Sequence, residues 1–229
     1  MTLIFDYDGT LHNTLRLYGT AFRKAYAMLV EEGYAPEHFY RDEELSKYLG
    51  VNAPDMWKDF MPWLPDEIWQ KASAVIGKEM IDGVLGGQAV LYDGVDSMLS
   101  TLKQQGYRLL ILSNCRTAYM DAHRRALGLD RWFEGYFCAE AYGFIPKEKI
   151  FPHLRDAFPD REYLMIGDRD SDFRVGTVNG LRTIGCAYGF GTKEELAPCW
   201  AVIRSPEELP LLLNRAGSSS EQSPTDAVS

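Results

Sequence analysis

Carboxylate and hydroxyl side chains follow three short apolar runs of this 229-residue sequence, each at the point where the run ends. These side chains are Asp6, Ser113 and Asp168. A single aspartate after a strand is usually a turn or helix-cap residue. In an open parallel sheet, however, the carboxyl ends of the strands meet at one edge, and ligands bind beyond that edge. Three such positions therefore predict one shared site for residues that lie far apart in the sequence.

The first position belongs to a pair of carboxylates, Asp6 and Asp8, that are separated by one residue. Side chains two residues apart point the same way on an extended segment, and Gly9 permits a sharp turn directly after them. Two like charges so close raise the pKa of one carboxyl unless a cation lies nearby. The pair therefore suits a division of labour, with one carboxylate as nucleophile or metal ligand and the other as proton carrier.

A second acidic cluster consists of Asp168, Asp170 and Asp172. Together with the first pair it forms a hard oxygen site, which favours Mg²⁺ over zinc or copper. Its spacing also resembles the start of a calcium-binding loop. That interpretation fails, because the sixth position is Phe173 where such loops need glycine and the twelfth is Asn179 where they need glutamate.

Other catalytic arrangements are absent from the sequence. There is no P-loop, no GxSxG nucleophile elbow and no HExxH helix. The four cysteines are far apart and form no CxxC pair, which is typical of reduced thiols rather than of disulfides or a zinc site. The four histidines are scattered, and we interpret them as surface or packing residues: His12, His38, His123 and His153.

The elements that must position these residues alternate along the chain. Apolar runs predict buried strands over residues 3–5, 108–112, 136–139, 163–166 and 183–186. Helical patterns lie between most of them, over residues 96–105, 117–127, 147–158 and 170–179. This alternation predicts an α/β fold, a doubly wound and mainly parallel sheet of the Rossmann-like kind.

One segment breaks the alternation, because residues 15–86 contain helical patterns but no convincing strand. The expected helices are residues 15–32, 42–49, 54–60 and 66–84. About 70 residues are too many for an ordinary crossover between neighbouring strands. We therefore expect residues 1–14 and 87–215 to form the core, residues 15–86 to form an inserted all-helical cap, and the small polar residues of 216–229 to form a flexible tail.

The overall charge excludes some partners. The chain has 33 acidic and 24 basic residues and a formal net charge of −9, which argues against nucleic acid or an anionic membrane surface as a partner. No apolar run approaches the roughly 20 residues that cross a bilayer, and the N-terminus has no basic region of a secretory signal. We expect a cytoplasmic protein.

Four segments, taken in order, resemble the motifs of the haloacid dehalogenase-like superfamily. They are residues 6–11, residues 112–114, Lys147 after Pro146, and residues 167–172. The helical segment resembles the helical cap of this superfamily, and residues 91–95 resemble its return segment in the phosphoglycolate phosphatase-like branch.

This resemblance implies a role for each candidate residue. Asp6 would attack phosphorus and form an aspartyl-phosphate, while Asp8 would protonate the leaving oxygen and then accept a proton from water. Mg²⁺ would be held by the Asp6 carboxylate, the Asp8 main-chain carbonyl and Asp168, with Asp172 nearby. The phosphoryl oxygens would be bound by Ser113, Asn114 and Lys147.

The resemblance implies a Mg²⁺-dependent phosphatase that hydrolyses a small phosphate monoester, such as a phosphoglycolate-like or sugar-phosphate metabolite. Asp8 argues against dehalogenase chemistry, and Tyr18 stands where mutase-like members carry a hinge histidine. Three alternatives remain on the same site: a pyrophosphatase, a sugar-phosphate phosphoryl transferase or mutase, and a non-catalytic binding module. We expect a monomer or a homodimer.

Overall fold

The computed structural model describes residues 1–220, with side chains as far as Ala216. A single sheet has the strand order β3-β2-β1-β4-β5-β6, and each described pair of neighbouring strands is parallel. Its strands are β1 (Thr2–Phe5), β2 (Arg108–Ser113), β3 (Gly135–Cys138), β4 (Tyr163–Gly167), β5 (Arg182–Cys186) and β6 (Ala201–Ile203). The α/β class expected from the alternating pattern is confirmed.

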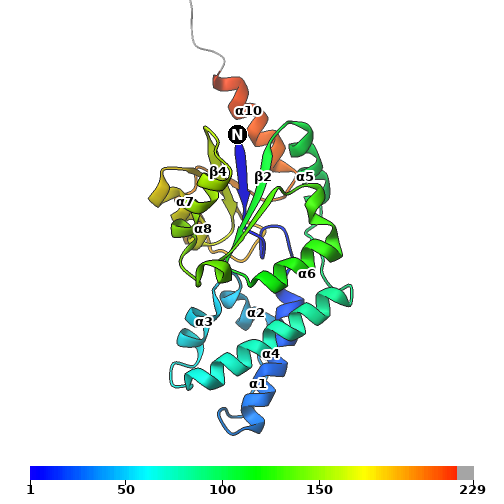
Figure 1. Cartoon of the computed structure of the whole chain (residues 1–229), viewed down its shortest axis with the longest axis vertical. Helices are drawn as coiled ribbons and strands as arrows, with labels where there is room; N and C mark the ends of the chain where they lie inside the picture. The colour runs from blue at the N-terminus through cyan, green and yellow to red at the C-terminus, as the bar shows by residue number, and fades with distance from the viewer. Residues whose placement is uncertain (221–229) are drawn as a thin grey trace, which may run out of the picture.

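Helices cover both faces of this sheet (Figure 1). Alternate residues of β1 show the two layers, since Leu3 and Phe5 belong to one buried apolar cluster and Ile4 belongs to another. The first cluster includes residues of α5 (Val95–Gln104), α6 (Thr117–Leu127) and α10 (Glu208–Ser220). The second includes residues of α7 (Lys147–Ala157) and α8 (Asp170–Asn179). Both faces of the central strands are therefore buried, as their continuous apolar sequence requires.

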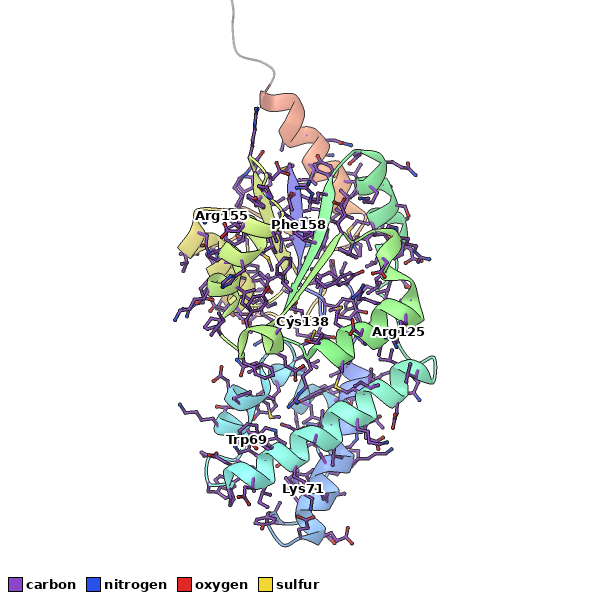
Figure 2. The ribbon with its side chains drawn as sticks, in the orientation of Figure 1. Trp69, Lys71, Arg125, Cys138, Arg155 and Phe158 are labelled. Carbon is purple, nitrogen blue, oxygen red and sulfur yellow. The ribbon has the colours of Figure 1, made fainter. Side chains whose placement is uncertain are left out.

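The segment between β1 and α5 forms what we call the helical insertion, residues 15–86. Its helices are α1 (Leu15–Glu31), α2 (Asp42–Leu45), α3 (Ala53–Phe60) and α4 (Asp66–Leu85). They have a buried apolar cluster of their own, in which Phe22 stacks on Trp57. The insertion lies beyond the carboxyl ends of the strands: in Figure 2, Cys138 at the end of β3 lies on the side of the insertion, and Phe158 lies at the opposite end of the sheet. It therefore covers the edge where the candidate residues meet.

The structure differs from the elements expected in the sheet and in the helical insertion. The helix expected over residues 42–49 is α2 followed by a 3-10 turn at Ser46–Tyr48, because the Ser46 hydroxyl donates to the carbonyl of Glu43 and competes with the helical pattern. Strand β6 was not expected from the sequence. Its sequence is a three-residue apolar run, but the strand lies at the edge of the sheet with Val202 exposed and pairs with β5 alone.

The C-terminal end of regular structure also lies later than expected. Helix α10 continues to Ser220, so residues 216–220 of the expected tail belong to a helix. Residues 221–229 of that tail lie outside the described residues. A short helix, α9 (Lys193–Leu196), precedes β6. Among the described helices, none has the length and the apolar composition that a membrane span needs.

Candidate active site

Three carboxylates come together where β1 and β4 end. These strands are direct neighbours, with Phe5 opposite Ile166, so the residues that follow them lie side by side. Asp6 follows β1, Asp168 follows β4, and Asp172 lies in the first turn of α8. All three are buried, and one oxygen of each lies within 4.8 Å of the others. The structure thus brings together two clusters that are far apart in the sequence.

Lys147 lies between two of these carboxylates. It is the first residue of α7, and its side chain is fully buried. Its Nζ lies 2.7 Å from Asp6 Oδ1 and 2.7 Å from Asp172 Oδ1. Burial lowers the pKa of Lys147, but Asp172 and Asp6 outweigh it and hold the pKa above its usual range. Lys147 is therefore a fixed positive charge, not a solvated lysine at a helix start.

The charge of this cluster fits a divalent cation. Three carboxylates and one lysine give a formal charge of −2, and burial together with Asp172 and Asp168 raises the pKa of Asp6 despite the opposing effect of Lys147. Asp6 Oδ2 is buried without a hydrogen-bond partner among the described residues. A buried carboxylate oxygen without a hydrogen-bond partner lowers the stability of the folded protein unless a ligand contacts it. Hard carboxylate oxygens around such a position are the donors that Mg²⁺ prefers.

Asp168 has a tightly packed environment. Its Oδ1 accepts a hydrogen bond of 3.0 Å from the Thr10 hydroxyl, and its Oδ2 accepts one of 2.8 Å from the Phe190 N–H. Gly9 has a φ of +89°, and a Cβ there would lie 2.4 Å from Asp168 Oδ2. This glycine is required both for its backbone conformation and for space. Burial, reinforced by Asp172, raises the pKa of Asp168 to about 7.

Asp172 holds the loop that carries Asp168. Its Oδ2 accepts hydrogen bonds from the N–H groups of Asp168, at 3.1 Å, and Arg169, at 3.0 Å. Asp170, the third acid of this sequence cluster, is exposed and does not join the buried carboxylates. The reason is helical geometry, because residues two apart at the start of α8 point in different directions.

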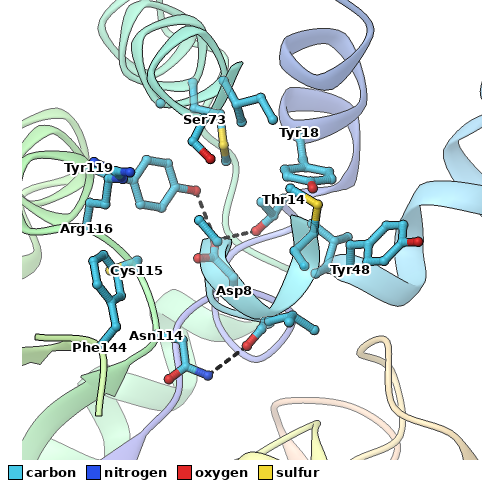
Figure 3. A pocket seen from close by; sticks show the side chains of 18 residues that line it. Asp8, Thr14, Tyr18, Tyr48, Ser73, Asn114, Cys115, Arg116, Tyr119 and Phe144 are labelled. Carbon is cyan, nitrogen blue, oxygen red and sulfur yellow. Dashed lines mark hydrogen bonds between the residues drawn. The ribbon is translucent and has the colours of Figure 1, made fainter. Parts of the chain in front are cut away.

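Asp8 lies apart from the buried carboxylates and faces a different set of groups. Its Oδ1 accepts hydrogen bonds from the hydroxyl of Thr14 and, at 2.9 Å, from that of Tyr119 (Figure 3). His12 Nδ1 lies 3.2 Å from the same oxygen. Burial raises the pKa of Asp8, but His12 and Thr14 outweigh it, and the net shift is downward. The two carboxylates of the first motif therefore have opposite pKa shifts.

Two histidines that we expected to be surface or packing residues lie in the group around Asp8. His12 and His123 are both fully buried, with ring centroids 4.5 Å apart. Tyr7 Oη lies 2.6 Å from His123 Nδ1. Burial, together with His12, lowers the pKa of His123 to about 3, so this imidazole is neutral. The sequence contains one indication that His123 lies near Tyr119, because the two residues are four apart on α6 and share a helix face.

The candidate phosphate-binding residues of the second motif lie at the end of β2. Ser113 is buried, and its Oγ accepts a hydrogen bond of 3.3 Å from the N–H of Cys115. The Asn114 side chain donates instead to the carbonyl of Gly50, at 2.8 Å, and so connects the core to the helical insertion. In this arrangement the Asn114 amide side chain positions a loop of the insertion.

A cavity of about 130 Å³ lies between the core and the helical insertion. Asp8 and Thr14 form part of its wall on one side, and Tyr18 and Tyr48 contribute from the insertion (Figure 3). It adjoins Asp8 rather than Asp168, which does not line it. A molecule that reacts at Asp6 and extends past Asp8 would therefore enter this cavity.

Known proteins resemble the chain in both sequence and fold. A family model described as haloacid dehalogenase-like hydrolase matches residues 1–177. A 5'-nucleotidase of Pseudomonas aeruginosa is 31% identical over 200 residues, which cover 85% of this chain and 86% of that protein. A phosphoglycolate phosphatase of Pasteurella multocida is 26% identical over 217 residues, which cover 86% of this chain and 91% of that protein. The crystal structure of a predicted phosphatase from Clostridium acetobutylicum has the same fold, with a TM-score of 0.80, 21% identity, and coverage of 93% of this chain and 98% of that one.

Proposed function

The chain belongs to the haloacid dehalogenase-like hydrolases, and from this premise we propose that it is a Mg²⁺-dependent phosphatase that hydrolyses a small phosphate monoester through an aspartyl-phosphate on Asp6. The observation that carries the proposal is the buried group of Asp6, Lys147, Asp168 and Asp172, in which one Asp6 oxygen has no partner. Lys147 together with a divalent cation at this group would supply the positive charge that the transfer of a phosphoryl group needs, since that reaction depends on positioning and charge neutralisation.

In the first step, an Asp6 carboxylate oxygen attacks phosphorus and the bond from phosphorus to the alcohol oxygen breaks. Asp8 donates a proton to the departing oxygen, and the alcohol leaves. The negative charge of the bound phosphate would favour the protonated carboxyl that this step needs, against the downward shift of the pKa of Asp8 in the free protein. Asp8 is suited to this task because it lines the cavity that would hold the alcohol.

In the second step, water attacks phosphorus and the bond from phosphorus to Asp6 breaks, which releases inorganic phosphate. Asp8, now a carboxylate, accepts the proton of that water. The hydroxyl groups of Thr14 and Tyr119 hold Asp8 in place during both steps, and they stabilise its charged form.

Lys147 would contact the phosphoryl oxygens, with Ser113 and the backbone N–H groups near Asn114. Asp6, Asp168 and the main-chain carbonyl of Asp8 would hold Mg²⁺, and Asp172 would support them. The ion would supply positive charge that neutralises the phosphoryl oxygens and the surrounding carboxylates. We also propose that the helical insertion is a cap, since it covers the carboxyl edge of the sheet and has its own apolar cluster.

Replacing Asp6 with asparagine tests the assignment of the nucleophile. We expect Asp6→Asn to lower the hydrolysis of p-nitrophenyl phosphate by at least about 10³-fold, because the neutral amide is a poor nucleophile. The side chain keeps its size, so circular dichroism and the thermal midpoint should show a folded protein. Asp170→Asn is the matched control, since Asp170 is exposed and outside the buried cluster. If Asp6→Asn hydrolysed p-nitrophenyl phosphate at an unchanged rate, Asp6 would not be the nucleophile.

A further inference from the structure

The cavity beside Asp8 indicates what kind of alcohol the substrate carries. We infer, resting on the phosphatase activity proposed above, that the substrate is a phosphate monoester whose alcohol carries an uncharged ring, as nucleoside 5'-monophosphates do. A second acidic group on the alcohol, as in phosphoglycolate, does not fit the chemistry of the cavity wall. Five features of the structure support this choice.

The first feature is the composition of the wall. Most of its side chains are apolar or aromatic, and they come from both the core and the helical insertion (Figure 3). Of the side chains that line it in the described part of the chain, two are charged, Asp8 and Arg116. Arg116 is paired with Glu140, with 3.4 Å between the nitrogen and the oxygen. A second anionic group would enter an apolar cavity without a cation to receive it, which is costly.

The second feature is the pairing of charges in the neighbouring polar cavity, which extends from Lys147 toward Arg174. The cations that line it already contact carboxylates. The pairs are Lys147 with Asp172 at 2.7 Å, Arg169 with Glu195 at 3.1 Å, and Arg174 with Glu148 at 2.9 Å. Acidic residues also line this cavity, so its charge does not favour a second anion of the substrate either.

The third feature is a glycine within a helix. Gly77 lies in the interior of α4 and lines the cavity, and a Cβ placed there would meet no atom within 4 Å. Glycine inside a helix costs about 0.5–1 kcal/mol relative to alanine. Neither packing nor a special backbone angle explains this glycine, so its effect is to leave open space in the wall for a bulky group.

The fourth feature is backbone strain at Phe144. Among the described residues it is the one non-glycine residue with a positive φ, at 59°, and it lines the cavity. A bulky side chain rarely adopts this conformation, which costs on the order of 1–3 kcal/mol and occurs mostly at functional sites. The strain keeps an aromatic ring in the wall, where it can pack against another ring.

The fifth feature is the set of hydroxyl groups among the apolar surfaces. Tyr18, Tyr48 and Ser73 line the cavity from the insertion. Burial, with a smaller contribution from Tyr48, raises the pKa of Tyr18, so its hydroxyl stays neutral. The Ser73 oxygen accepts a hydrogen bond of 2.6 Å from Trp57, which leaves its own proton free to be donated. Neutral hydroxyls beside apolar faces suit a ring that also carries sugar hydroxyls.

The experiment compares two substrates and two leucine variants of α4. Wild-type protein is assayed with a purine nucleoside 5'-monophosphate and with phosphoglycolate. Gly77→Leu places a side chain in the cavity, whereas Ala74→Leu adds a leucine to the exposed side of the same helix. We expect wild type to prefer the nucleotide by about tenfold or more in kcat/KM. Gly77→Leu should lower that preference by about tenfold, chiefly through KM, and Ala74→Leu should leave it unchanged.

The outcomes separate this inference from the proposed function. Hydrolysis of phosphoglycolate in preference to the nucleotide would overturn the inference and leave the phosphatase intact. An equal loss on both substrates in Gly77→Leu would overturn it as well. If wild type hydrolyses neither substrate nor p-nitrophenyl phosphate, the proposed function itself fails. In that case, saturable protection of the wild-type protein from thermal unfolding by the nucleotide, lost in Gly77→Leu, would show that the ring site exists.

Discussion

Asp6 and Asp8 show how two identical residues of one motif acquire different chemistry. Asp6 is buried beside two other carboxylates, and its pKa is raised although Lys147 opposes the shift. Asp8 lies beside His12 and Thr14, which lower its pKa although burial opposes them. The groups that shift the pKa of Asp6 come from distant parts of the sequence, whereas His12 and Thr14 belong to the loop that follows Asp8. At the scale of residues, Asp6 thus belongs to the buried charged cluster, and Asp8 belongs to the wall of the cavity.

The Thr14 hydroxyl allows the environment of Asp8 to be tested. Thr14→Val removes a donor to the charged form of Asp8 and keeps the shape of the side chain, so the pKa of Asp8 should rise. We expect kcat to fall about tenfold and the acidic limb of the pH–rate profile to move to higher pH. Thr14→Ser keeps the hydroxyl and is the matched control. If the acidic limb does not move in Thr14→Val, the Thr14 hydroxyl does not influence proton transfer by Asp8.

The residues of the site were predictable from sequence in part. Asp6, Lys147, Asp168 and Asp172 could be expected together, because each stands beside the end of a strand or the start of a helix at one edge of the sheet. The pairing of His12 with His123 could not, because it depends on how the loop after Gly9 packs against α6. Contacts of this kind follow from packing in three dimensions, which periodicity along the chain does not specify.

Strand and helix signals are strongest where an element is long or fully buried. Strand β1 has four residues, yet all are buried and apolar or β-branched, so its sequence indicates a strand. Strand β6 is also apolar in sequence, but it is three residues long and partly exposed at the edge of the sheet. Contacts between elements were the least predictable: Arg169 donates at 2.7 Å to the carbonyl of Leu49, beside the contact of Asn114 with Gly50. At the scale of elements, these contacts hold a loop of the insertion against the core.

The contact of Arg169 predicts a measurable effect on that loop. Arg169→Ala removes its hydrogen bond to the backbone of Leu49 and its ion pair with Glu195. We expect faster amide hydrogen exchange in residues 46–52 and a rise in KM of about three- to tenfold, since the wall of the cavity is less well ordered. Arg161→Ala is the control, because Arg161 is exposed near the start of β4, at the opposite end of the sheet. Unchanged exchange in residues 46–52 would show that the loop is held by other contacts.

At the scale of the whole molecule, the negative charge has a specific distribution. Part of the formal net charge of −9 is the buried group of Asp6, Asp168 and Asp172. One lysine does not neutralise three ionised carboxylates, and this excess of negative charge, together with burial, raises the pKa values of Asp6 and Asp168. Such an arrangement lowers global stability unless protons or a cation compensate for it.

This charge predicts how stability depends on pH and on Mg²⁺. The pKa of Asp168 is about 7 in the folded protein, against about 3.9 for an unfolded aspartate, so between these values the folded state binds the extra proton. Without divalent cation, the free energy of unfolding should therefore fall as pH rises from about 4 to about 7, by up to about 1.4 kcal/mol per pH unit. Mg²⁺ should compensate most at the upper end, where the carboxylates are charged.

Thermal midpoints measured in EDTA and in Mg²⁺, at about pH 5 and about pH 8, check this prediction without any assay of activity. We expect Mg²⁺ to raise the midpoint at the higher pH and to have little effect at the lower one. Asp168→Asn should be less sensitive to pH in EDTA, because the amide does not titrate and can still accept the hydrogen bond from Phe190. If wild type and Asp168→Asn lost stability equally with rising pH and Mg²⁺ protected neither, the buried carboxylates would not be a cation site.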